Sequence, residues 1–327
     1  MKALVTGGTG FIGSNVVDLL VADGHSVRLF SRKAGLPARF SGKDVSAFGG
    51  DLEDAESVLR AMEGMDVFYH IGEIKNTSPR AVKNNVKLME KVVGHLDASG
   101  IKRIVFISSI SVAGIPEVKP ATEETPSRLP LRDPYTRYKE QCEKFLSEKA
   151  AGTEYAVIRP GVVYGSGSRY LGGLIAAVDR LGTLGIPFVG QGRSIAPLVH
   201  VKDLARAVYR AGIEDAAAGR IFNITDGMQN TWSDFLHAIG NALGKEIRIL
   251  PLPPLLFSVP ARFFDLFAGL LGATMSLDAF VSYVTTDLLF MNDRAQQLLH
   301  WKPEYLLAQG VEEMVSEYRT KRGRAVT

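Results

Sequence analysis

A tyrosine and a lysine stand four residues apart, at Tyr135 and Lys139. The stretch 134–150 is predicted to be a helix after Asp133-Pro134, so both side chains should lie on one face. A phenol is a poor base at neutral pH, but a neighbouring ammonium group favours the phenolate and lowers its pKa. Such a pair can take a proton from an alcohol or give one to a carbonyl oxygen.

A serine hydroxyl could hold the same substrate oxygen. Two serines, Ser109 and Ser111, lie at the end of a strand predicted over 102–108. Ser109 is the favoured candidate and Ser111 the alternative. Tyr138 is a rival aromatic in the same helical turn as Tyr135, but position 142, four residues on, is a cysteine.

The chain begins with a glycine-rich turn. Gly7, Gly10 and Gly13 follow a short apolar strand and precede residues with helical period. The first glycine permits a tight turn, the second lets a phosphate approach the backbone, and the third lets the helix pack close to the strand. The helix N-terminus then faces the anion, so this context predicts a nucleotide site.

Short apolar strands alternate with helices through the first half of the chain. Strands are predicted at 2–6, 25–30, 44–48, 66–71, 102–108 and 154–159, and helices at 54–63, 80–99 and 134–150. This alternation predicts a parallel sheet covered on both faces, with ligands at the carboxyl ends of its strands. Further on, we expect helices at 171–181, 202–212, 231–243, 292–303 and 306–319, and strands at 196–201, 220–225 and 246–250.

The composition limits the class of protein. The net charge of +3 over 327 residues is too small to indicate nucleic-acid binding, and the single cysteine excludes an internal disulfide and a metal cluster. No uncharged apolar run reaches the roughly 18 residues of a membrane span. We therefore expect a cytoplasmic enzyme without a metal. The most apolar stretch, 250–290, is interpreted as core helices, a substrate lid or, through 255–272, a peripheral membrane contact.

Taken in order, the motifs resemble the extended short-chain dehydrogenase/reductase superfamily, also called the NAD-dependent epimerase/dehydratase family. The segments that carry the resemblance are Thr6–Gly13, Gly50-Asp51-Leu52, Asn85-Val86, Ser108-Ser109, Tyr135-x-x-x-Lys139, Arg159–Gly165 and His200-Val-x-Asp203. The resemblance implies a Rossmann doubly wound parallel sheet with a smaller C-terminal α/β substrate lobe. Residues 1–165, with 196–225 returning, would mainly form the cofactor domain, and 166–195 and 226–327 the substrate lobe.

The resemblance also implies roles for individual residues. Ser109, Tyr135 and Lys139 would be catalytic. The cofactor would be met by Thr6, Gly7, Gly10, Phe11, Ile12, Gly13, Asp51, Leu52, Asn85, Lys139, Pro160 and Val162. The backbone after the fourth strand would line the cofactor where the family usually has small alanines, and Glu73 is unusual at that edge. The resemblance further implies a homodimer through the helices 80–99 and 134–150.

The residues after the second strand bear on the choice of cofactor. An NAD enzyme of this kind would place a carboxylate there, on the ribose hydroxyls. Ser31, Arg32 and Lys33 stand there instead, and two cations and a hydroxyl could receive a 2′-phosphate. We expect NADP(H), with NAD(H) as the alternative if Arg32 and Lys33 merely solvate a loop.

Two enzymatic reactions compete. Ala196 and Pro197 occupy the positions where sugar-nucleotide members carry an Arg-Asp pair, although Arg193 is near, and 273–291 contains no Arg or Lys. This favours a hydroxyl–carbonyl oxidoreductase with a hydrophobic sterol-, flavonoid- or polyketide-like substrate, as in the 3β-hydroxysteroid dehydrogenase and dihydroflavonol reductase branches. A nucleotide-sugar epimerase or dehydratase is the alternative, and a non-catalytic NADP-binding sensor a remote one. The residues after Ser109 do not form the Asp-Glu pair of dehydratases.

Overall fold

The core of the protein is a parallel sheet of seven strands, seen here in a computed structural model that describes residues 1–33, 35–74, 79–129, 133–150, 152–254 and 277–324. The strand order is β12-β8-β5-β4-β1-β2-β3. The strands are β1 (Lys2–Thr6), β2 (Ser26–Ser31), β3 (Val45–Gly49), β4 (Val67–His70), β5 (Arg103–Ile107), β8 (Glu154–Pro160) and β12 (Arg220–Ile224). The order reverses beside β1, which confirms the predicted doubly wound Rossmann sheet.

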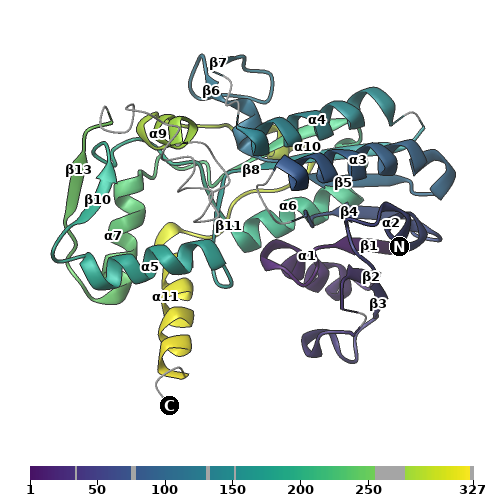
Figure 1. The fold of residues 1–327 in the computed structure, drawn as a ribbon, viewed down its shortest axis with the longest axis horizontal. Helices are drawn as coiled ribbons and strands as arrows, with labels where there is room; N and C mark the ends of the chain where they lie inside the picture. Colours follow the sequence, from purple (N-terminus) through teal and green to yellow (C-terminus); the bar gives the residue numbers. More distant parts are fainter. Residues whose placement is uncertain (34, 75–78, 130–132, 151, 255–276, 325–327) are drawn as a thin grey trace.

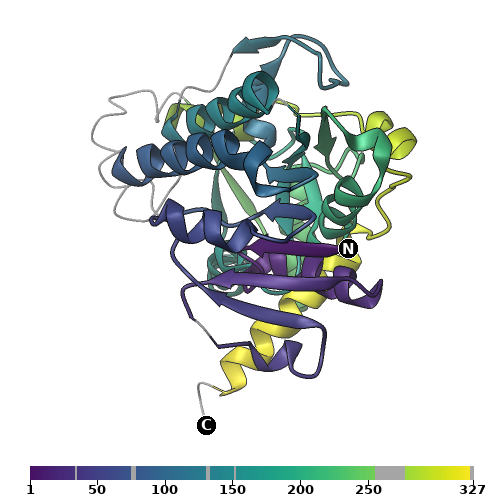
Figure 2. The same cartoon turned by 90° about the vertical axis from the view of Figure 1, so that its right-hand side faces the viewer.

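Helices cover both faces of this sheet (Figure 1). On one face, α1 (Phe11–Ala22) and α6 (Val201–Ile213) pack against each other and bury Val16, Leu20 and Leu204. On the other face lie α2 (Ala55–Met62), α3 (Pro79–Ser99) and α4 (Pro134–Lys149), and α3 and α4 run side by side in both views (Figures 1 and 2). The central strands β1, β4, β5 and β8 are buried on both sides, which explains their nearly continuous apolar sequences.

A second group of elements lies beyond the carboxyl edge of the sheet. It contains β9 (Val162–Tyr164) paired with β11 (Leu198–His200), β10 (Ile186–Val189) paired with β13 (Ile249–Leu252), α5 (Arg169–Leu181), α7 (Trp232–Leu243), α9 (Leu277–Thr285) and α11 (Leu307–Arg324). α5, α7 and α11 share a separate apolar cluster that includes Ile175, Phe235 and Val311. The α/β architecture of the smaller lobe is therefore as predicted.

Several boundaries differ from the sequence prediction. The strand predicted at 246–250 lies at Ile249–Leu252, because it pairs in parallel with β10, a strand that was not predicted. β11 pairs with β9 rather than with the main sheet, so within 196–225 it is β12 that joins that sheet. The Thr231 capping box of α7 is confirmed.

Smaller elements complete the described chain. They are η1 (Ala38–Phe40), η2 (Ile110–Ala113), η3 (Asp215–Ala217), β6 (Ile115–Pro116), β7 (Ser127–Leu129) and α10 (Asp293–Leu298). α10 packs on β12, and Ala295, Leu299 and Trp301 join the core of the main sheet. The stretch 255–272, predicted as a lid or membrane contact, lies outside the described residues. Among the helices that the structure describes, none is long and apolar enough to cross a membrane.

Candidate active site

Tyr135 and Lys139 lie on α4, which packs against η2, the short turn of helix that follows β5. Asp133 caps the helix by accepting a hydrogen bond from Thr136 N at 3.0 Å, and Pro134 occupies its first turn. Lys139 is 4% exposed, and its Nζ donates to the Ile107 carbonyl oxygen at 2.8 Å. This bond fixes the ammonium group at the strand end, 5.6 Å from the ring centroid of Tyr135. The structure thus brings the predicted pair together.

The ammonium group of Lys139 has two further neighbours. Glu73 Oε2, in the loop after β4, lies 3.2 Å from Nζ, and the ring centroid of Tyr138 lies 4.8 Å away. Burial disfavours the charged lysine, but Tyr138 and Glu73 outweigh it and raise the pKa of Lys139. Tyr138 is 4% exposed, and burial raises the pKa of its phenol well above the usual value. Tyr138 Oη donates to Glu73 Oε2 at 3.3 Å.

Ser109 and Ser111 belong to one short chain of hydroxyl groups. Ser109 follows β5, and its Oγ lies 2.9 Å from Ser111 Oγ. Ser111 Oγ lies 3.0 Å from Thr136 Oγ1, which is 2.6 Å from Asp133 Oδ2. Ser111 is 2% exposed whereas Ser109 is half-buried, so Ser109 is the more accessible of the two serines. The sequence did not predict that the Thr136 hydroxyl and the Asp133 carboxylate extend this hydrogen-bonded chain.

A buried ion pair joins α4 to the main sheet. Arg159, at the end of β8, donates from Nε to Glu143 Oε1 at 2.9 Å and from a terminal nitrogen to Oε2 at 2.5 Å. The Ser108 hydroxyl donates to the same carboxylate. Glu143 follows Lys139 by one helical turn, so the pair locks α4 against β5 and β8. In the sequence, the feature that could have indicated this ion pair is Glu143, four residues after Lys139.

The glycine turn fits the diphosphate of a dinucleotide. Gly7 has φ = +70°, and a Cβ on Gly13 would lie 2.4 Å from the Gly7 carbonyl oxygen. Gly10 is exposed at the N-cap of α1, where no side chain caps the helix. The first N–H groups of α1 are therefore open to an anion. Thr6 is buried at the end of β1, and Phe11 and Ile12 form the half-buried first turn of α1.

The loop after β4 passes against this glycine turn. Gly72 N donates to the carbonyl oxygen and the hydroxyl of Thr6, at 3.0 and 3.1 Å. The Asn85 side chain holds both backbone polar groups of Ile74, at 2.9 and 3.1 Å. His70 Nδ1 lies 2.9 Å from Thr6 Oγ1, and burial lowers the pKa of this imidazole to about 3. Asn85 therefore orders the loop that carries Glu73.

The remaining predicted cofactor residues also lie at carboxyl ends of strands. Ser31 ends β2, and its Oγ donates to the Lys33 carbonyl oxygen at 2.6 Å. The Arg32 and Lys33 side chains are exposed. After β3 come Asp51, which is exposed and accepts from Glu53 N at 3.0 Å, and the half-buried Leu52. Pro160 ends β8, and Val162 begins β9.

An apolar cluster adjoins the two catalytic candidates. Ile110, directly after Ser109, packs with Ile115, Ala121, Tyr283, Leu288 and Phe290, and Val162 and Trp232 pack against them. Burial raises the pKa of the Tyr283 phenol, and Tyr135 adds to this effect. Residues of the C-terminal lobe therefore come close to Tyr135. Lys119, at the edge of this region, pairs with Asp287 at 3.5 Å.

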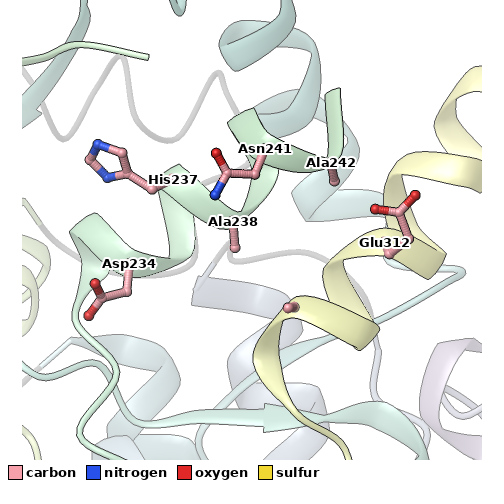
Figure 3. Close-up of a pocket in the computed structure, with 7 residues that line it drawn as sticks. Asp234, His237, Ala238, Asn241, Ala242 and Glu312 are labelled. Atoms are coloured by element: carbon pink, nitrogen blue, oxygen red, sulfur yellow. The ribbon is translucent and has the colours of Figure 1, made fainter. Parts of the chain in front are cut away.

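A separate pocket lies between α7 and α11 (Figure 3). It is lined by Asp234, His237, Ala238, Asn241, Ala242, Ala308 and Glu312. None of the predicted catalytic or cofactor residues lines it. The predicted cofactor residues lie instead near the carboxyl ends of the strands of the main sheet.

The fold and the site define an NAD(P)-dependent enzyme with a Rossmann domain and a Ser, Tyr and Lys set. Residues 3–225 match the NAD dependent epimerase/dehydratase family, and the chain belongs to it. A 2-alkyl-3-oxoalkanoate reductase of Stenotrophomonas maltophilia is 29% identical over 255 residues, covering 73% of this chain and 76% of the relative. A UDP-glucose 4-epimerase of Vibrio cholerae is 27% identical over 330 residues, covering 96% and 94%.

The solved structures agree on the fold. A UDP-glucose 4-epimerase of Bifidobacterium longum, in complex with NAD+ and UDP, superposes with a TM-score of 0.76. It is 20% identical in sequence, and the match covers 99% of each chain. The relatives thus include both a reductase and epimerases, which are the two reactions that the sequence left open.

Proposed function

We propose that the protein is an NADP-dependent oxidoreductase that interconverts a hydroxyl and a carbonyl group on a hydrophobic, sterol-, flavonoid- or polyketide-like molecule. The observation that carries the proposal is the apolar cluster beside Ser109 and Tyr135. Ile110, Tyr283 and Phe290 are each at most 7% exposed and extend from the catalytic helix side into the C-terminal lobe. An apolar wall next to a proton donor suits a ketone on a hydrocarbon skeleton.

Tyr135, Ser109 and Lys139 would have separate roles in this reaction. When bound, the reduced nicotinamide supplies a hydride. Tyr135 gives its phenolic proton to the carbonyl oxygen, and the Ser109 hydroxyl donates a hydrogen bond to the same oxygen. Lys139 holds positive charge beside the phenol and stabilises the phenolate that forms. In the opposite direction Tyr135 takes the proton of the alcohol.

The preference for NADP rests on the residues after β2. Among the described residues, Arg32 and Lys33 have no carboxylate within ion-pair distance, so both cations are available to a ligand. A 2′-phosphate there would gain charge-assisted hydrogen bonds that a plain ribose would not. The proposal also includes a homodimer through α3 and α4, which rests on the resemblance to the family, and a cytoplasmic location, which rests on the sequence.

Nucleotide-sugar epimerisation is the second candidate, and the similarity to UDP-glucose 4-epimerases over nearly the whole chain favours it. The local structure at Ala196 and Pro197 does not favour the epimerase. Ala196 is 0% exposed, and the Pro197 carbonyl oxygen accepts from Val162 N at 2.7 Å. Where an Arg-Asp pair would meet a nucleotide diphosphate, this chain therefore presents a buried methyl group and a proline.

Thermal-shift screening with NADPH, combined with UDP-sugars, steroids and β-keto compounds, separates the two candidates. We expect stabilisation by a steroid or a β-keto compound, followed by NADPH oxidation with that ketone in a spectrophotometric assay. Stabilisation by UDP-sugars alone, with interconversion of UDP-glucose and UDP-galactose, would instead establish the epimerase. NADH replacing NADPH in every assay tests the cofactor separately.

A further inference from the structure

Glu73 is held in place by the backbone on either side of it. Gly72 is hydrogen-bonded to Thr6, and Ile74 is clamped by the Asn85 side chain. From this fixed loop the Glu73 carboxylate reaches the ammonium group of Lys139 at 3.2 Å. The Glu73 side chain is 33% exposed, whereas that of Lys139 is 4% exposed. A carboxylate at the edge of the site thus pairs with a buried catalytic cation.

The other titratable groups around Lys139 are neutral at pH 7. Burial raises the pKa of the Tyr138 phenol well above its usual value and that of the Cys142 thiol to about 12, both on α4. Burial lowers the pKa of the His70 imidazole, on β4, to about 3. Tyr283, which comes from α9 and lies on the Tyr135 side, also has its phenol pKa raised by burial.

Charged groups nearby are Glu73 and, one turn along α4, Glu143. The charge of Glu143 is balanced by the paired contact with Arg159. Among the described groups that face Lys139, Glu73 is therefore the one whose charge acts on the ammonium group. A carboxylate in contact with the ammonium offsets part of the positive potential that Lys139 exerts on the Tyr135 phenol.

We propose that Glu73 is a positioning residue that acts through Lys139, and that it keeps the Tyr135 phenol protonated so that the site works as a proton donor to a carbonyl oxygen. This inference rests on the proposed function and adds that the site is suited to reduction of the carbonyl group. In reduction the carbonyl carbon receives the hydride, the carbonyl oxygen receives the Tyr135 proton, and the phenolate regains a proton from water. A bare lysine would favour the phenolate and hence the oxidation of an alcohol.

Glu73→Gln tests the inference because it keeps the shape and removes the charge. The readout is the tyrosinate absorbance followed against pH in the protein without ligands. The same titration of Tyr135→Phe, with and without Glu73→Gln, identifies the Tyr135 contribution. We expect the apparent pKa of Tyr135 to fall by about one unit or more in Glu73→Gln. The alkaline limb of kcat/KM for ketone reduction should move to lower pH by the same amount.

Tyr138→Phe is the matched control. It removes the other hydrogen bond to Glu73 but leaves the carboxylate, so the titration of Tyr135 should stay in place. Glu73→Ala provides the same measurement if the glutamine variant does not fold. An unchanged Tyr135 titration in both Glu73 variants would overturn the inference. Because the titration needs no substrate, a protein that reduces no ketone yet shows the shift would contradict the proposed function alone.

Discussion

The side-chain oxygens of Ser109 and Ser111 lie 2.9 Å apart, so the two candidate serines share a hydrogen bond. Beyond them, Thr136 carries one hydroxyl proton, and the Asp133 carboxylate can only accept. Ser111 Oγ donates to Ser109 Oγ, and Thr136 gives its one proton to Ser111 Oγ or to Asp133 Oδ2. In either arrangement Ser111 orients the Ser109 hydroxyl, and Ser109 is the more exposed of the two serines.

Replacing the two serines should therefore have unequal effects. Ser109→Ala removes a donor to the developing oxyanion and should lower kcat for ketone reduction by about 100-fold. Ser111→Ala removes a supporting hydrogen bond and should lower kcat by about fivefold. Steady-state kinetics with NADPH measure both variants, and thermal shift with NADPH checks that each still binds the cofactor. The reverse order of the two effects would make Ser111 the serine that touches substrate.

Replacing the two tyrosines on α4, Tyr135 and Tyr138, should likewise have unequal effects on kcat. Tyr135 is half-buried near Tyr283, whereas Tyr138 is buried with its hydroxyl on Glu73. Tyr135→Phe removes the proton donor and should lower kcat by about 100-fold or more. It should leave NADPH binding intact, as measured by thermal shift.

Tyr138→Phe is the matched variant, because it deletes the same hydroxyl from the same helix, one turn further on. It should cost about fivefold in kcat at most, since it removes one hydrogen bond to a half-exposed carboxylate. If Tyr138→Phe is the inactive variant instead, the proton donor has been assigned to the wrong tyrosine. If both variants keep full biological activity, the protein is a sensor rather than an enzyme.

Much of the sheet could be predicted from sequence, because buried parallel strands leave continuous apolar runs between helical periods. β1, β5 and β8 agree with their predicted ranges to within a residue or two. The short strands of the smaller lobe could not be placed in the same way. β10 has Pro187 within it, and β13 is defined by its partner at the other end of a long connection, so tertiary pairing sets their bounds.

The site was partly predictable for the same reason. Residues at or just after the ends of parallel strands must lie at one edge of the sheet, and Gly7, Ser109 and Pro160 do so. The spacing of Tyr135 and Lys139 on a helix predicted their shared face. The carboxylate of Glu73 comes from the loop after β4, and no local pattern shows that it reaches Lys139. Such contacts between distant segments need the three-dimensional structure.

The exposed cation after β2 gives a test of cofactor choice. Arg32→Ala removes a charge that would meet a 2′-phosphate, so the Michaelis constant for NADPH should rise about tenfold or more. The constant for NADH should hardly change, because NADH has no phosphate at that position. Arg220→Ala is the control: it removes an exposed arginine at the opposite edge of the sheet, on β12. Equal increases in the Michaelis constants for NADPH and NADH in Arg32→Ala would contradict the proposed preference for NADP.

We expect His200 to make the stability of the fold depend on pH. Its side chain is 0% exposed and stacks on Tyr305 with ring centroids 4.0 Å apart. Neither ring nitrogen has a hydrogen-bond partner among the described residues, and the nearest carboxylate oxygen, of Glu313, lies 3.8 Å away. Burial lowers the pKa of His200 to about 4, from 6.5. The folded protein therefore keeps this imidazole neutral.

The sign of the effect follows from this lowered pKa. Between pH 6.5 and about 4 the unfolded chain binds a proton that the folded protein does not, so stability falls as the pH falls through this window. The shift corresponds to roughly 3 kcal/mol in the free energy of unfolding at pH 4. His200→Phe keeps an aromatic ring against Tyr305 and removes the titration. We expect urea unfolding of this variant to lose less stability than the wild type between pH 7 and pH 4.5.

A residual loss should remain in His200→Phe, because burial also lowers the pKa of His70 to about 3. His237→Gln, at an exposed histidine on α7, should leave the pH dependence as it is in the wild type. An identical slope for His200→Phe and the wild type would mean that His200 is already protonated in the folded state near pH 5. In that case Glu313, at 3.8 Å, would pair with the imidazolium strongly enough to offset the burial of the ring.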